Sequence, residues 1–213
     1  MKLYDYFRSS AAYRVRIALN LKGLAPSREF VHLRNNVQRS DDYLALNPQG
    51  LVPALVTDGG EVLTQSLAII GYLDETHPAP PLLPANATER ARVRGIALEI
   101  ACDIHPLNNL RVLLYLKNTL GVADEQKDAW YKYWIDVGLE ALETRLARDP
   151  ATGRFCHGDT PSVADICLVP QMSNARRMKI DVSPFATLTR IETACNALPA
   201  FADAAPSKQP DAE

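Results

Sequence analysis

The stretch KLYDYFRSSAAYRVRIALNLKG at residues 2–23 decides the fold. Its first part, Lys2–Phe7, is short and aromatic, which is typical of a β-strand. Ser9 and Ser10 follow, and they precede a mostly apolar helical pattern that Gly23 ends as a C-cap. The sequence therefore predicts a strand, a serine turn and a helix, with the serines at the helix N-terminus.

Strand and helix signals continue to alternate as far as residue 76. After the first helix we expect strands at 29–33, 52–56 and 61–63, a hairpin turn at Asp58–Gly60, and helices at 40–46 and 67–76. This order describes a small mixed sheet with helices, which is the thioredoxin-like arrangement.

The second part of the chain has a different pattern. The segment His77–Asn86 contains four prolines and is predicted to be a linker. Beyond it the strand signal disappears, and apolar residues recur at helical spacing over 91–120, 124–148 and 163–175. We therefore expect an α/β thioredoxin-like domain at 1–82 and an all-helical domain at 88–213, with a loosely held polar tail at 202–213.

Composition excludes several classes of function. The 213 residues carry a net charge of -2, so no global positive field attracts nucleic acid or an anionic membrane. No apolar run is long enough for a signal peptide or a membrane span, and we expect a cytoplasmic protein. The four cysteines are scattered without metal-ligand spacing, which predicts reduced thiols and no metal site.

Two predicted helix starts carry polar groups suited to anions. A helix N-terminus presents unpaired N–H groups and a partial positive charge, and Ser9 or Ser10 can add an O–H donor for a thiolate. Gln65 and Ser66 at the later helix start suit a carboxylate in the same way. The alternative at both places is that the serine only caps its helix.

Six segments resemble the zeta class of the glutathione transferase family, and they are spread so widely that the resemblance extends over nearly the whole chain. They are FRSSAAYRVRIALNLKG at 7–23, LNPQGLVPAL at 46–55, TQSLAIIGYLDE at 64–75, CDIHPLNNLRVL at 102–113, GDTPSVADICLVPQ at 158–171 and NARRMKIDVSPF at 174–185. The resemblance implies a glutathione transferase fold with glutathione as cofactor.

The resemblance also implies roles for particular residues. It places Ser9 at the catalytic position, with Ser10 and Ala11 supporting it, and it implies a cis bond at Val52-Pro53 that exposes backbone groups to the cysteinyl part of glutathione. Gln65 and Ser66 correspond to the γ-glutamyl site. The weaker candidates for cofactor contacts are Gln38, Gln49, Asp103 reaching across a dimer interface, Arg111, and the pair His105 and Asn109. That pair shares one helix face if the helix is unbroken, although Pro106 can place His105 in the first turn.

The chain departs from many zeta-class members at two positions. Ala11 and Ala12 stand where a cysteine and a serine are common, which indicates that the reactive sulfur comes from the cofactor and not from the protein. For a dicarboxylate substrate the resemblance further implies cations near that sulfur. Arg8 and Arg177 are the preferred candidates, whereas Arg176 fits a solvated helix face better.

The implied activity is the glutathione-dependent cis–trans isomerisation of maleylacetoacetate to fumarylacetoacetate by a homodimer. Maleylpyruvate is the alternative substrate. A general glutathione-conjugating enzyme and a non-catalytic glutathione-binding module are alternatives from other classes. Ser162 and Asp165 match a helix capping box, which we assign to folding and not to catalysis.

Overall fold

The computed structural model describes all residues, 1–213. Contacts within the chain define two compact units, one formed by Met1–Pro81 with Asn196–Glu213 and the other by Leu82–Cys195. The division into functional domains at 1–82 and 88–213 stays a prediction.

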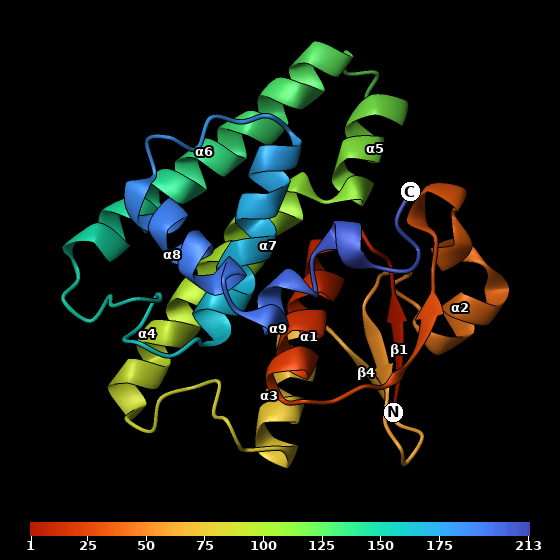
Figure 1. Cartoon of the computed structure of the whole chain (residues 1–213). Helices are drawn as coiled ribbons and strands as arrows, with labels where there is room; N and C mark the ends of the chain where they lie inside the picture. Colours follow the sequence, from red (N-terminus) through yellow and green to blue (C-terminus); the bar gives the residue numbers. More distant parts are fainter. The chain divides into compact units, whose positions relative to one another are not determined.

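The first unit contains a mixed four-stranded sheet (Figure 1). Its strands, in the spatial order β2-β1-β3-β4, are Ser27–Phe30, Lys2–Asp5, Ala54–Val56 and Val62–Thr64. Strand β1 pairs in parallel with β2, and the other two pairings are antiparallel. The predicted thioredoxin-like arrangement is therefore confirmed.

All four strands have boundaries that differ from the expected ones, and two of these differences have a clear cause. The strand predicted at 29–33 occupies Ser27–Phe30, because the parallel register pairs Lys2 with Ser27 and Asp5 with Phe30, where β1 ends. The strand predicted at 52–56 begins at Ala54, because Pro53 has no N–H to donate to a ladder.

Helices cover both faces of this sheet. Helices α1 (Ser10–Leu21) and α3 (Ser66–Thr76) pack side by side on one face, and α2 (Asp41–Leu46) lies on the other (Figure 1). Alternation along β1 explains the two faces: Leu3 and Asp5 are fully buried under α1, whereas the neighbouring Tyr4 packs its ring against Tyr43 of α2.

The second unit is helical. Its α-helices are α4 (Ala87–Leu98), α5 (Leu110–Asn118), α6 (Asp124–Arg148), α7 (Val163–Arg177) and α8, which is Ala186–Asn196 and ends at the border with the first unit. The predictions at 124–148 and 163–175 are confirmed, but α8 was missed. Its first turn receives a tertiary cap, since the Glu143 carboxylate accepts bonds of 3.0 Å from the N–H groups of Thr187 and Leu188.

The single helical pattern predicted at 91–120 is wrong. After α4 the backbone widens into a π-helical turn, η3 (Glu99–Ile104), and then tightens into a 3₁₀ turn, η4 (His105–Asn108), before α5 begins. Pro106 explains the change, because proline has no N–H and its ring clashes with the carbonyl four residues earlier in a regular α-helix.

The prediction of a loosely held tail at 202–213 is also wrong. After a short helix, α9 (Pro199–Ala202), and a 3₁₀ turn, η5 (Pro206–Lys208), Asp211 Oδ2 accepts a 2.9 Å bond from the Phe7 N–H. Gln209 is only 6% exposed and donates to the carbonyls of Asp203 and Ala205. Asp211 thus ties this segment to the rest of the first unit, and Gln209 ties its own turns together.

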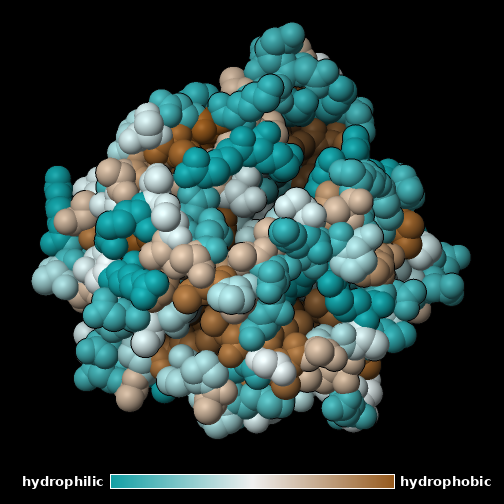
Figure 2. Space-filling model, in the orientation of Figure 1, coloured by the Kyte–Doolittle hydropathy of each residue, from teal (hydrophilic) through white to brown (hydrophobic).

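The face of the molecule shown in Figure 2 is largely polar. Hydrophilic residues cover most of this face, and hydrophobic residues show between them in smaller patches. None of the helices combines the length and the apolar character needed to cross a membrane.

The predicted capping box is present at the start of α7 and is buried. Asp165 is fully buried and accepts bonds from the N–H and O–H of Ser162, both 2.9 Å, and from the Cys156 N–H at 2.8 Å. Burial raises the pKa of this carboxyl group, while the donors oppose that rise. The box therefore ties a loop to the helix start and takes no part in a site.

We expect Asp165→Ala to lower the free energy of unfolding by about 3 kcal/mol, because it leaves buried donors without an acceptor. Urea unfolding measures this loss. Glu140→Ala, which replaces an exposed acid on α6, is the matched control and should change stability by less than about 0.5 kcal/mol. Equal effects of the two substitutions would contradict the structural role.

Asp211→Ala should lower the free energy of unfolding by about 1–2 kcal/mol, because the buried Phe7 N–H loses its acceptor. Asp211→Asn keeps one oxygen acceptor and should restore most of that loss in the same urea experiment. If neither Asp211→Ala nor Asp211→Asn changes the free energy of unfolding, the tail is not anchored through this bond.

Candidate functional site

The turn between β1 and α1 is held by a buried arginine. Arg16 lies on α1 and donates to Asp5 at 2.7 Å, to the carbonyls of Tyr6 and Phe7 at 3.4 and 3.1 Å, and to the carbonyl of Ala204 at 3.0 Å. Burial lowers the pKa of Arg16, but the facing carboxylate opposes this. Arg16 therefore joins the backbone that leads into the serine turn both to α1 and to the C-terminal segment that contains Ala204.

The two serines of the turn have different environments. Ser9 is the N-cap of α1 and is half-buried, and its Oγ accepts a 3.2 Å bond from the Ala12 N–H. Because that bond uses a lone pair, the hydroxyl proton of Ser9 stays available for donation. Ser10 is 6% exposed, and Ala11 beside it is half-buried. Ser9 thus both caps the helix and presents a donor.

Arg8 precedes these serines and is exposed. Its guanidinium lies 5.1 Å from the centre of the Phe7 ring, a cation–π contact. The charge of Arg8 is therefore held near the end of β1 while remaining accessible.

The second predicted element is the loop before β3. The Val52-Pro53 bond is cis, as expected, and both residues are buried. Upstream, the Leu51 carbonyl accepts bonds from the hydroxyl of Tyr43 at 2.6 Å and from the amide of Asn47 at 2.8 Å. These bonds fix the loop against α2.

The third predicted element is the start of α3. Gln65 is exposed and adopts a φ of 68°, which is uncommon for a residue with a side chain and is found most often at functional sites. Its amide donates a 3.1 Å bond to the amide oxygen of Gln49, so the fold brings these two candidates together. Gln38 is buried and donates to the Leu33 carbonyl at 3.2 Å.

Ser66 is the first residue of α3 and is 6% exposed. Its Oγ accepts a 3.3 Å bond from Arg14, a residue of α1 that is itself 2% exposed. Sequence reasoning missed Arg14. The available signal was the pattern Tyr13-Arg14-Val15-Arg16-Ile17, which places two cations within a helix that is buried nearly all round.

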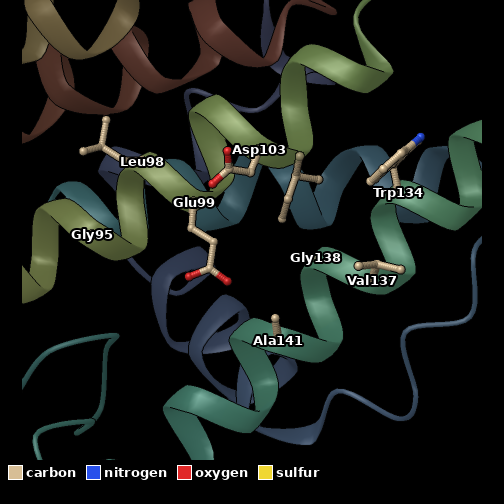
Figure 3. Close-up of a pocket in the computed structure, with 9 residues that line it drawn as sticks. Gly95, Leu98, Glu99, Asp103, Trp134, Val137, Gly138 and Ala141 are labelled. Atoms are coloured by element: carbon tan, nitrogen blue, oxygen red, sulfur yellow. The ribbon is translucent and has the colours of Figure 1, made fainter.

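In the second unit, Asp103 lies in the π-helical turn and is exposed. It borders a groove of about 530 Å³ between α4 with its π turn and α6, shown in Figure 3. Leu98, Trp134 and Val137 give this groove an apolar lining. Gly138 lets the two helices approach, since a Cβ there would lie 2.3 Å from Ile104.

The helix is interrupted at Pro106, so His105 and Asn109 do not share one face of a continuous helix. His105 starts the 3₁₀ turn η4, and Asn109 ends it and becomes the N-cap of α5, with its side chain accepting a 3.1 Å bond from the Arg111 N–H. The side chain of Arg111 is exposed. Asn109 therefore has a structural role that the unbroken pattern concealed.

The two arginines at the end of α7 have different partners. Arg176 is held by Glu192 through three hydrogen bonds of 2.6–3.1 Å, which raise the pKa of Arg176. Arg177 is exposed and makes a single 3.5 Å contact with the hydroxyl of the buried Tyr131, besides one to a methionine sulfur. Of the pair, only Arg177 keeps a guanidinium free for an anion.

Known proteins match this chain in sequence over most of its length. Residues 8–76 match the model of the family described as "Glutathione S-transferase, N-terminal domain". A probable maleylacetoacetate isomerase of Vibrio cholerae is 53% identical over 212 residues, which cover 99% of this chain and 97% of that protein.

Two solved structures are similar over the full length of both chains. One is the holo structure of a maleylpyruvate isomerase, described as a bacterial zeta-class glutathione S-transferase, with 48% identity and a TM-score of 0.97. The other is a maleylacetoacetate isomerase of Methylobacterium extorquens with bound malonate and glutathione, with 45% identity and a TM-score of 0.98. The chain belongs to the zeta class of the glutathione transferase family.

Proposed function

We propose that this chain is a glutathione-dependent cis–trans isomerase that converts maleylacetoacetate to fumarylacetoacetate. The observation that carries the proposal is the Ser9 hydroxyl at the N-terminus of α1, whose lone pair is used by the Ala12 N–H and whose proton is therefore available. The 53% identity to a probable maleylacetoacetate isomerase over nearly the whole chain supports the same activity.

Ser9 suits an anionic sulfur for two reasons. A free thiol titrates near ~8.5, so it is mostly protonated at neutral pH unless its surroundings favour the thiolate. The 12-residue helix α1 supplies a positive N-terminal dipole, and the hydroxyl supplies a hydrogen bond to the same atom. Ser10 and Ala11 support this turn through their backbone.

The donor groups of the chain fit glutathione. Gln65, Ser66 and the N-terminus of α3 suit its γ-glutamyl carboxylate, and the backbone around Val52 and Pro53 suits its cysteinyl part. The further contacts that we propose are Gln38 and Gln49 from the first unit, and Asp103, His105, Asn109 and Arg111 from the second.

Bound glutathione supplies a thiolate that adds reversibly to the cis double bond and leaves again after rotation about it. Arg8 and Arg177 hold the substrate carboxylates and favour negative charge on the conjugated ketone. Their planar guanidinium groups can each grip a carboxylate through two parallel bonds. Glutathione is regenerated in each turnover.

Maleylpyruvate is the second candidate substrate. A similar zeta-class structure that covers the whole chain is that of a maleylpyruvate isomerase. The two substrates share the maleyl double bond, its conjugated ketone and two carboxylates, so the same residues suit both.

We further propose that the chain is a cytoplasmic homodimer. Asp103 is exposed at the groove between α4 and α6, and the apolar Leu98 and Val137 beside it are 46% and 43% exposed. A second copy placed there would cover these apolar side chains and bring Asp103 to the partner's glutathione amine.

The activity is tested by following the loss of cis-substrate absorbance for both maleyl acids, with and without glutathione. Ser9→Ala should lower turnover by about 100-fold, since a donor to the reacting anion is lost. The matched control is Ser40→Ala, because Ser40 caps α2 in the same way but lies outside the proposed site. Turnover that is independent of glutathione, or equal in the Ser9→Ala and Ser40→Ala variants, would contradict the proposal.

The homodimer is tested by light scattering coupled to gel filtration. Leu98→Glu should convert the dimer to a monomer, because it places a charge in the apolar groove. Leu120→Glu replaces another exposed leucine, which does not line the groove, and it should leave the mass unchanged. A wild-type chain that elutes as a monomer at all concentrations contradicts the dimer.

A further inference from the structure

Arg14 is a buried cation without a counter-ion. Its side chain is 2% exposed, its Nη1 donates to Ser66 Oγ at 3.3 Å, and its Nε and Nη2 have no hydrogen-bond partner. Arg16 on the same helix is equally buried but is matched by Asp5 and by three carbonyl groups. The two arginines therefore differ in how their charge is balanced.

An unpaired buried guanidinium opposes folding. Arginine stays protonated at all physiological pH values, so it cannot relieve the burial of its charge by losing a proton. Removing such a charge from water without a partner is costly, and a bound anion nearby would offset that cost. The position of Arg14 thus favours an anionic ligand close to its only partner, Ser66.

The groups around Ser66 indicate where that anion binds. Ser66 opens the 11-residue helix α3, which packs beside α1 (Figure 1), so its unpaired N–H groups and dipole act at the same place as the Arg14 charge. Because Ser66 Oγ accepts a bond from Arg14, its own proton is left to donate to a ligand oxygen. The N-terminus of α3, the Ser66 hydroxyl and the Arg14 guanidinium are therefore all suited to the same carboxylate.

We propose that Arg14 is a positioning residue that acts through Ser66 to hold the γ-glutamyl carboxylate of glutathione. The inference rests on the proposed function, since it takes glutathione as the ligand. Arg14 does not touch the sulfur or the substrate. Its effect is to orient the Ser66 hydroxyl and to place a permanent positive charge behind the carboxylate site.

The test measures binding of two ligands to the full-length chain by titration calorimetry. One ligand is glutathione, and the other is γ-aminobutyryl-cysteinyl-glycine, which differs only in lacking the γ-glutamyl carboxylate. Arg14→Met should raise the Kd for glutathione by about tenfold or more, while the Kd for the analogue changes by less than about twofold. In a Ser66→Ala background the effect of Arg14→Met on glutathione should fall to about twofold.

The matched control is Lys22→Met on the same helix. The Lys22 side chain is also buried, but it already pairs with Asp74 at 2.7 Å, so its loss should change both affinities by the same factor. If Arg14→Met weakens both ligands equally, Arg14 has only a structural role and the inference is overturned. If the wild-type chain binds neither ligand, the proposed function fails, and that result is distinct from equal weakening.

A second variant keeps the test decisive if Arg14→Met does not fold, which urea unfolding reports. Arg14→Lys keeps the charge but loses the planar geometry, so it should bind glutathione about threefold more weakly than the wild type. Its affinity for the analogue should equal that of the wild type. Equal losses for the two ligands in this variant would again overturn the inference.

Discussion

The buried ion pair between Asp5 and Arg16 is the interaction on which the rest of the first unit depends. Asp5 is fully buried and also pairs with Arg28, while Arg16 binds the carbonyls that lead into the serine turn. Breaking such a pair leaves an uncompensated charge in the interior, which is strongly destabilising. The position of Ser9 at the start of α1 is therefore set by a charge pair one to two helical turns away, and also by the tail that supplies the Ala204 carbonyl.

Local patterns predicted the fold well where local chemistry determines it. The serine turn, the end of α1 at Gly23 and the capping box at Ser162 all follow from residues close in sequence; Gly23 follows the C-cap Lys22 and has a φ of 67°. Prediction failed where the structure depends on contacts between residues that are far apart in the sequence. The Asp211 bond to Phe7 and the Glu143 cap on α8 join segments 204 and 44–45 residues apart, so polar composition alone did not reveal them.

The candidate site shows the same division. Gln65 and Ser66 were recognisable because a polar pair stands at a predicted helix start, and the resemblance to the zeta class added their ligand. Arg14 was missed despite the apolar pattern around it, because a guanidinium on a helix normally reaches solvent and its burial here depends on the packing of α1 against other helices. Likewise, the interruption of the helix before Asn109 gives this proposed ligand contact a capping role that the sequence pattern did not reveal. Side-chain roles depend on burial, which one sequence does not contain.

The central claim is that the N-terminus of α1 and the Ser9 hydroxyl together favour a thiolate. The ultraviolet absorbance of the thiolate, followed against pH for glutathione bound to the chain, measures this directly. The account predicts that the pKa of the bound thiol lies at least about one unit below the ~8.5 of a free thiol, and that Ser9→Ala returns it most of the way. A bound thiol that titrates like the free one would contradict the account.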